Sequence, residues 1–312
     1  MNVSRQSDRH SDEIDLREFL RVLWAAKWVI GITTMTAAVI SVIVALMLPN
    51  IYRAEALLAP NEQEGASGLS ALAAQYGGLA SFAGIDLTGG SADKTTLGIE
   101  TLKSRKFVSA FVERRDILVP LIASEGWDAK TSDLKIDADS YDTVRKKWVR
   151  DVRPPRQAIP TSQEAYKEFM DIMSVNRDDL SGLITVAVEH YSPEVAKEWV
   201  DWLVEDINDA VMKQDVAEAE QAIEFLHQQI ENTSLAGLKS VFFRLIEEQT
   251  KTVMLARASS EYLFRTLDPA VVPELKARPR RSIGIMVATL LTGFFSTLLV
   301  LIRHAYTAKP PA

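Results

Sequence analysis

The chain has no cysteine among its 312 residues and only four histidines. Without cysteine there can be no disulfide, no thiolate nucleophile and no cysteine-ligated metal. The histidines lie in no metal-ligand spacing; they are His10, His190, His227 and His304. No Gly-Lys pair and no Gly-x-Ser-x-Gly motif occurs, so the phosphate-binding loop of nucleotide hydrolases and the serine-hydrolase elbow are both missing. The sequence therefore predicts no catalytic residue, no cofactor and no metal site.

Basic residues are also fewer than acidic ones, 35 against 42. The chain carries a formal net charge of -7 at pH 7, and the stretch between its two long apolar runs is likewise acidic. Proteins that bind nucleic acid usually present a basic surface. The charge balance therefore argues against nucleic acid as a partner.

Charged residues are missing altogether from two long runs. One spans residues 28–48 and the other residues 283–302. A helix rises about 1.5 Å per residue, so each run is long enough to cross a hydrocarbon core of about 30 Å. The first run exceeds the apolar core of a signal peptide and follows a polar head, so we predict an uncleaved signal anchor rather than a cleaved signal. Both runs are predicted to be transmembrane helices.

Basic residues predict how these spans are oriented. Among those that precede the first span are Arg9, Arg17, Arg21 and Lys27. The positive-inside rule therefore places residues 1–27 in the cytoplasm, and two spans return residues 303–312 to the same side. A second basic group, Lys276, Arg278, Arg280 and Arg281, argues for the opposite orientation. Long loops cross the membrane largely regardless of charge, so we expect residues 49–282 to lie outside, with this group at the headgroup level.

The external loop mixes predicted strands and helices. Strands are expected at residues 51–60 and 183–190, and helices at 96–118 and 163–173. The glycine-rich segment 65–90 is interpreted as a packing segment, with a plain loop as the alternative. The basic segment 141–156 is interpreted as a solvated helix face with Trp148 turned inward. Its alternative role is contact with an anionic glycan or lipid through Arg145, Lys146, Lys147 and Arg150.

The most informative stretch predicts one very long helix. Ser192 is a favourable N-cap, Pro193 suits the first turn, and no glycine or proline follows for about 38 residues, so the helix should span 193–231. A return helix is expected at about 235–259, followed by a strand. The apolar stripe is narrow, so we predict that neighbouring subunits of a homo-oligomer cover it. The predicted contact residues are Ala196, Val200, Leu203, Ile207, Ala210 and Ala217.

These elements predict a fold class. The chain should be an α+β membrane protein in which two transmembrane helices flank an α/β base with a long protruding helical hairpin of coiled-coil character.

Three stretches resemble one family of membrane proteins. IDLREFLRVLWAAKWVI, EHYSPEVAKEWVDWLVEDIN and FFRLIEEQTKTVMLARASSEYLFRTLDPAVVPE are similar to the Wzz-type chain-length determinants, the polysaccharide co-polymerases of lipopolysaccharide O-antigen synthesis. The family also has a proline-rich basic segment before a glycine-bearing last span. Here Pro269, Pro273, Pro279 and Gly293 occupy the matching places, while Thr292 stands where a second glycine is often found. That departure bears on how closely the last span packs on its partner.

The resemblance implies an inner-membrane homo-oligomer with its bulk in the periplasm. Such a protein would be a non-catalytic regulator that acts as a scaffold on the O-antigen polymerase and its growing lipid-linked glycan. The related capsule branch often carries a fused kinase, for which this chain has neither motif nor room. On this view the prolines form a stiff strap between the base and the last span.

Two other functions stay open at this point. One is a periplasmic adaptor of a polysaccharide export machine, although such adaptors commonly have a single span and this chain has two apolar runs. The other is a membrane-bound glycan-processing enzyme, since two convergent carboxylates suffice for glycoside chemistry.

Overall fold

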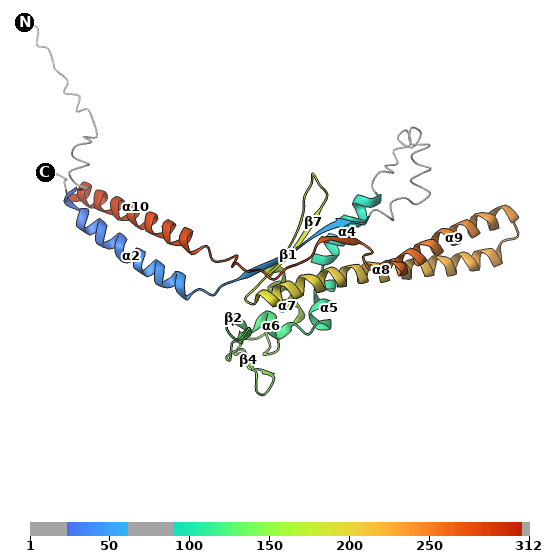
Figure 1. Cartoon of the computed structure of the whole chain (residues 1–312), viewed down its shortest axis with the longest axis horizontal. Helices are drawn as coiled ribbons and strands as arrows, with labels where there is room; N and C mark the ends of the chain where they lie inside the picture. The colour runs from blue at the N-terminus through green and yellow to red at the C-terminus, as the bar shows by residue number, and fades with distance from the viewer. Residues whose placement is uncertain (1–23, 62–89, 308–312) are drawn as a thin grey trace, which may run out of the picture. The chain divides into compact units, whose positions relative to one another are not determined.

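The computed structural model describes residues 24–61 and 90–307. The predicted segments 1–23, 65–89 and 308–312 lie outside the described residues. The chain divides into two compact units, one made of Met1–Pro49 with Arg278–Ala312 and the other of Asn50–Ala277. Mixed helix and sheet content, two apolar helices near the ends and a long helical hairpin confirm the predicted fold class (Figure 1).

The first unit is a pair of apolar helices. Helix α2 spans Lys27–Met47 and helix α10 spans Arg281–Thr307. Both are long and apolar enough to cross a membrane, with a mean hydropathy of 2.4 over their most apolar windows. Their hydroxyl groups are satisfied within the pair: Thr34 and Thr292 donate to carbonyls one turn back, and Thr33 Oγ1 lies 2.9 Å from Ser296 Oγ across the two helices. Internal satisfaction of polar groups suits a segment surrounded by lipid.

The second unit is built on a four-stranded antiparallel sheet in the order β6-β7-β1-β8. The strands are β1 (Tyr52–Pro60), β6 (Met173–Arg177), β7 (Ile184–His190) and β8 (Phe264–Asp268). In β1 the buried residues alternate, with Ala54, Ala56 and Leu58 on the core face. This period of two is that of a strand with one buried face.

Helix α7 (Ser162–Ile172) and the first half of α8 (Pro193–Asn232) pack on this sheet. Helices α4 (Gly90–Lys103), α5 (Arg105–Arg114) and α6 (Leu118–Ile122) pack in turn on α7 or α8. Side-chain caps fix where three of these helices begin: the side chains of Ser104, Thr161 and Ser192 each accept a bond from the third backbone N–H that follows. The core they enclose contains Phe111, Phe169 and Trp199, all nearly inaccessible.

Two short hairpins complete the base. One joins β2 (Ser124–Asp128) to β3 (Asp133–Ile136), and the other joins β4 (Tyr141–Asp142) to β5 (Lys147–Trp148). The second hairpin corrects the prediction of a helix over 141–156. Asp142 Oδ1 accepts bonds from the backbone N–H groups of Val144 and Arg145, and this Asx turn starts a reversal that no helix could follow. The predicted inward turn of Trp148 is instead a cross-strand contact with Tyr141, at 5.2 Å between ring centroids.

The long helical hairpin consists of α8, which has 40 residues, and α9 (Ala236–Ala258). At about 1.5 Å per residue α8 is about 60 Å long, far above the usual length. Figure 1 shows α8 leaving the base and α9 returning beside it. A single predicted helix over 96–118 is in fact α4 and α5, because Ser104 has extended backbone angles and caps the second of them.

Candidate functional site

The stripe of α8 that we predicted to contact neighbouring subunits begins in the core of the base. Ala196, Val200, Leu203 and Ile207 are fully buried in this chain, where they belong to the same cluster as the sheet residues. The prediction of subunit contact is therefore wrong for these four. Their own sheet covers them, because α8 packs across β1 and β7. Ala210 is half-buried against the same core, and only Ala217 is exposed.

Beyond the base, α8 and α9 pack on each other through a heptad seam. Ala219 and Leu226 of α8 are buried and lie seven residues apart, and Ala256 of α9 is fully buried. Heptad spacing of apolar residues is what keeps two helices in contact along their length. An ion pair between Arg257 Nη2 and Glu220 Oε1, at 2.6 Å, joins the two helices beside the seam. The hairpin is therefore closed within one chain.

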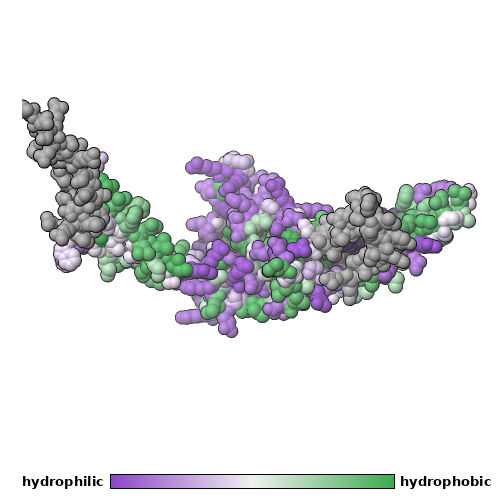
Figure 2. Space-filling view, turned by 90° about the horizontal axis from the view of Figure 1, so that it is seen from above, coloured by the Kyte–Doolittle hydropathy of each residue, from purple (hydrophilic) through white to green (hydrophobic). Residues whose placement is uncertain are grey.

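A second row of apolar residues on α9 stays partly exposed. We call it the α9 stripe: Leu238, Val241, Leu245 and Leu255, each between 40% and 48% exposed. Leu238, Val241 and Leu245 follow the three-and-four spacing of a helix-packing face, and Leu255 lies ten residues further along α9. Larger exposed residues lie nearby on the hairpin, namely Phe225, Phe243 and Met254. Figure 2 shows hydrophobic residues among hydrophilic ones over the end of the hairpin. Such a face on a soluble surface indicates an interaction surface.

Polar contacts fix the hairpin where it leaves the base. Asn208 of α8 is 3% exposed and makes four hydrogen bonds. Its Oδ1 accepts from the backbone N–H groups of Leu263 and Phe264, at 2.7 and 2.9 Å, and its Nδ2 donates to the Phe264 carbonyl at 3.1 Å. One side chain of α8 thus satisfies the backbone of the chain where it enters β8. These bonds fix the position of the segment between α9 and β8 relative to α8.

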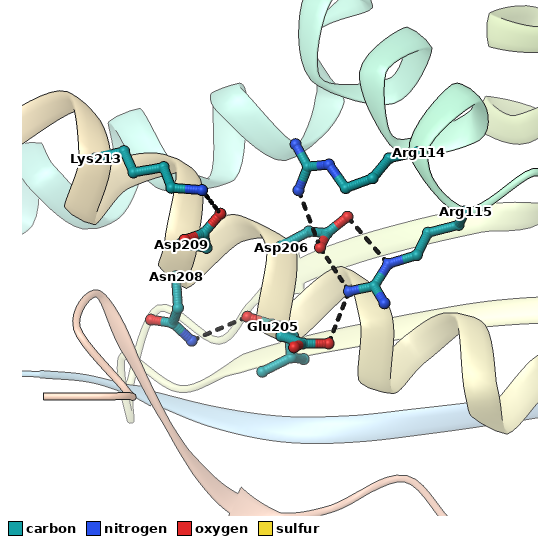
Figure 3. A network of polar contacts seen from close by, with 8 residues as sticks. Arg114, Arg115, Glu205, Asp206, Asn208, Asp209 and Lys213 are labelled. Atoms are coloured by element: carbon teal, nitrogen blue, oxygen red, sulfur yellow. Dashed lines mark hydrogen bonds and ion pairs between the residues drawn. The ribbon is translucent and has the colours of Figure 1, made fainter.

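Two residues before Asn208, two arginines hold a buried carboxylate. Arg115, just after α5, donates to Asp206 Oδ1 at 2.7 Å and to Glu205 Oε2 at 2.7 Å, and Arg114 approaches Asp206 Oδ1 at 3.2 Å (Figure 3). The Asp206 side chain is 4% exposed, so its charge requires these partners. The hydrogen bond to Asp206 raises the pKa of Arg115 above its ordinary value. This cluster ties α5 to the root of the hairpin and offers no free group for chemistry.

The imidazole of His190 is buried at the end of β7. Its Nδ1 accepts from the Ser192 N–H at 3.1 Å, which leaves Nε2 to donate to the Pro120 carbonyl at 3.1 Å. The Trp199 ring lies 4.9 Å away, centroid to centroid. Burial lowers the pKa of His190. Its two bonds and its burial define a neutral structural histidine between α6 and α8.

The basic hairpin β4–β5 contains both exposed and sequestered cations. Arg150 is a brace: it donates to the carbonyls of Gln157 and Ala158 and pairs with Glu164 Oε2 at 2.8 Å, so its side chain is only 14% exposed. Arg145, Lys146 and Lys147 are exposed at the turn. Of the four residues predicted to contact an anionic glycan or lipid, these three are accessible and Arg150 is not.

The proline-containing strap follows β8. We define the strap as residues 269–277. Pro269 is exposed, Ala270 is 4% exposed in the core, and Pro273 is partly buried. At its far end the Ala277 N–H donates to the Ile51 carbonyl at 2.8 Å, and Lys276 Nζ approaches Asn50 Oδ1 at 3.4 Å. The strap is therefore bonded to the linker that enters the base from the other end of the chain, a pairing that the sequence did not predict.

The sequence predicts that Pro279 belongs to the stiff strap and that Gly293 packs the last span on its partner helix. Pro279 lies just before α10, and Arg281 of α10 donates to the Leu48 carbonyl at 2.9 Å. Gly293 lies against α2, and a Cβ added there would meet Thr34 at 3.8 Å, an ordinary van der Waals distance. Gly293 thus faces the partner helix, but the spacing of the pair would also admit alanine at this position.

Among residues 24–61 and 90–307, no group of three or more His, Asp or Glu side chains is arranged to hold a metal ion. The described residues instead form a paired helical hairpin with partly exposed apolar residues. Asn208 and Asp206 bond this hairpin to the base, and the two linkers of the base are bonded to each other.

Comparison with known proteins places part of this arrangement in a family. Residues 12–114 match the family model of Wzz, described as chain length determinant protein. This region is of the Wzz type. The match confirms the resemblance seen in the sequence over the segment that contains α2, β1, α4 and α5. The second and third stretches that suggested the Wzz family, and its proline-rich segment, lie outside residues 12–114.

No curated protein matches the chain. Two solved structures are similar to it. A full-length bacterial polysaccharide co-polymerase is 15% identical with a TM-score of 0.39, and the alignment covers 95% of this chain and 100% of that one. A fragment of WzzB, the polysaccharide co-polymerase from Salmonella Typhimurium, is 11% identical with a TM-score of 0.29, covering 73% of this chain and 100% of the fragment. At these scores neither likeness supports a functional argument.

Proposed function

We propose that the chain is a non-catalytic regulator of polysaccharide chain length that acts on the O-antigen polymerase of lipopolysaccharide synthesis. The observation that carries this proposal is the Wzz match over residues 12–114. The two apolar helices that flank a mixed base and the closed helical hairpin support it, since they suit a membrane-anchored scaffold. The polymerase and the growing lipid-linked glycan are the proposed partners.

The proposed location is the inner membrane, with both termini cytoplasmic and residues 49–282 periplasmic. The basic residues before α2 support this orientation through the positive-inside rule. The absence of cysteine requires that a periplasmic base of this size be stabilised by its core alone or by assembly. The aromatic cluster of Phe111, Phe169 and Trp199 supplies such a core.

The proposed assembly is a homo-oligomer in which the α9 stripe contacts a neighbouring copy. One chain already covers the stripe of α8 in its base and the heptad seam of its hairpin. The α9 stripe stays partly exposed in one chain, and the spacing of its first three residues suits a further helix. The α9 stripe and the exposed Ala217 replace the buried residues of α8 as the proposed contact.

A scaffold can set chain length without making a bond. Length depends on the ratio between the rate of adding a repeat unit and the rate of releasing the glycan. Holding polymerase and glycan together changes that ratio, and a bias of about 1.4 kcal/mol changes it about tenfold. The polymerase retains all the chemistry.

A glycan length ladder from cells with and without the gene tests this function. Deletion should leave the repeat unit unchanged but replace a clustered length distribution with an unregulated, mostly short one. The wild-type gene supplied on a plasmid should restore the cluster. Complete loss of polymer would instead indicate an enzyme or an essential assembly factor. An unchanged ladder, in a strain without a second gene of this kind, would overturn the proposal.

The second candidate is a periplasmic adaptor of an export machine, which the closed coiled hairpin favours. The second apolar helix counts against it. The same deletion separates the two functions, because loss of an adaptor should lower the amount of polymer at the cell surface without changing its length distribution.

A further inference from the structure

The strap presents three apolar side chains that the described chain leaves half or more exposed or nearly so. Val271, Val272 and Leu275 are 68%, 47% and 84% exposed. They lie between two points at which the strap is attached to the base, the buried Ala270 and the Ala277 N–H bonded to Ile51. Both ends of the segment are thus held to the base. Its apolar residues are presented outward by the fold itself.

Basic residues accompany this apolar segment. Lys276 follows Leu275 directly, and Arg278, Arg280 and Arg281 follow within the next five positions. Glu274 is the only acidic residue between Pro269 and the end of α10. Exposed apolar side chains next to a run of cations are the combination that binds a bilayer surface, where the apolar groups enter the acyl boundary and the cations meet phosphate.

The covalent connection limits how far this segment can be from the membrane. Helix α10 begins at Arg281, six residues after Leu275. An extended chain covers at most about 3.5 Å per residue, so Leu275 lies within about 20 Å of the start of α10. The apolar window of α10 has 23 residues and is about 34 Å long, so its first turn reaches the headgroup layer outside a core of about 30 Å.

An aromatic pair lies at the same end of the base. Tyr52 follows Ile51, which accepts the bond from Ala277, and its ring packs edge-on against Trp127 at 5.5 Å between centroids. Both side chains are partly exposed. Tyrosine and tryptophan concentrate where bilayer and water meet. Two residues of types that concentrate at the membrane interface, Tyr52 of β1 and Trp127 of β2, therefore lie at the same end of the base as the strap.

We infer that the strap is a lipid-contacting element: Val271, Val272 and Leu275 enter the outer headgroup region of the membrane and Lys276 binds lipid phosphate. This inference requires that α10 crosses the membrane but does not depend on the role in polysaccharide synthesis. The base is then attached to the bilayer surface at the strap as well as through its two spans.

The absence of cysteine gives a direct test in the full-length chain. Leu275→Cys, labelled with the environment-sensitive fluorophore NBD, is reconstituted in vesicles of phosphatidylethanolamine and phosphatidylglycerol that contain lipid with a nitroxide near the headgroup. The matched control is Leu180→Cys. Leu180 is 100% exposed and follows β6, at the end of the sheet opposite Tyr52. We expect a blue-shifted emission and at least twofold stronger quenching at position 275 than at position 180.

A second variant separates lipid contact from contact with another copy. In the labelled Leu275→Cys protein, Lys276→Glu should reduce the quenching in the anionic vesicles because its carboxylate repels lipid phosphate. Equal quenching at positions 275 and 180 would overturn the inference. So would efficient disulfide formation between two unlabelled Leu275→Cys chains without lipid quenching, because a second copy would then cover the segment. A glycan ladder that fails to change on gene deletion would overturn the proposed function and leave this result standing.

Discussion

At the scale of single residues, the described chain uses its buried polar groups to fix geometry. Asn208 bonds the backbone at Leu263 and Phe264, Asp206 is held by two arginines, and His190 joins α6 to the start of α8. Each is satisfied by partners from a different element. Leaving such a group without its partner costs about 1–3 kcal/mol, so these residues specify how α5, α8 and β8 meet.

His190 gives the stability of the base a predictable pH dependence. Burial lowers its pKa in the folded chain, whereas the unfolded chain has the ordinary value of about 6.5. Below that value the unfolded state binds a proton that the folded state does not bind. The stability contribution is therefore present above pH 6.5 and is lost as the pH falls from there toward the folded pKa. The expected slope is at most about 1.4 kcal/mol per pH unit.

Thermal unfolding of the detergent-solubilised chain between pH 5 and pH 8 measures this slope. His190→Gln keeps an amide donor and acceptor but cannot titrate, so its unfolding free energy should fall less steeply below pH 6.5 than that of the wild type. His227→Gln replaces an exposed histidine of α8, and we expect it to keep the wild-type slope. A His190→Gln profile parallel to the wild type would contradict the assignment.

At the scale of elements, the α9 stripe yields the prediction about assembly. Val241→Asp or Leu245→Asp should weaken the oligomer at least tenfold, because an unpaired charge in an apolar contact costs more than about 1.4 kcal/mol. Ala217→Asp tests the one exposed residue of the original α8 prediction in the same way. The measurement is oligomer mass in mild detergent by light scattering.

Ser240→Asp is the matched control for that experiment. It adds the same charge to α9 at an exposed position outside the α9 stripe, so the oligomer should keep its size. If Val241→Asp, Leu245→Asp and Ala217→Asp all stay folded and also keep the full oligomer mass, the hairpin does not build the assembly.

The sequence predicted elements with strong local signals and failed where long-range contacts decide. Helix α8 was expected at 193–231 and spans Pro193–Asn232, because its cap and its lack of glycine or proline are local features. The sequence predicts that a neighbouring subunit buries Val200 and Leu203, because no local pattern shows that β1 and β7 pair beneath them. The reversal at Asp142 did have a signal: an aspartate able to cap its own turn, flanked by aromatic residues on both sides.

The candidate surface was harder to predict than the fold. The α9 stripe lies within a helix that is apolar on more than one side, and only the structure shows that Ala256 is fully buried while Leu245 and Leu255 stay 40% and 42% exposed. Likewise, the prolines were visible in the sequence, but the bond from Ala277 to Ile51 joins residues 226 positions apart and leaves no local trace.

At the scale of the whole molecule, the proposed orientation can be tested with the same cysteine-free chain. A single cysteine introduced within residues 65–90 should react with a membrane-impermeant maleimide in spheroplasts, whereas cysteines at Ser11 or Ala312 should be protected until the membrane is permeabilised. Reaction at Ala312 from outside would mean that the basic group before α10, rather than the one before α2, determines the orientation.

The shared helix α8 has a geometric consequence for any assembly. Its first half is set in the core of the base and its second half forms the hairpin, without a break in between. A tilt of the first half of α8 in the core would therefore also move its second half in the hairpin. The outer part of about 25 residues is about 38 Å long, so a tilt of about 5° at the core would move the tip by about 3 Å. Small repacking around Leu203 or Asn208 would thus change the distance between neighbouring tips in the proposed homo-oligomer.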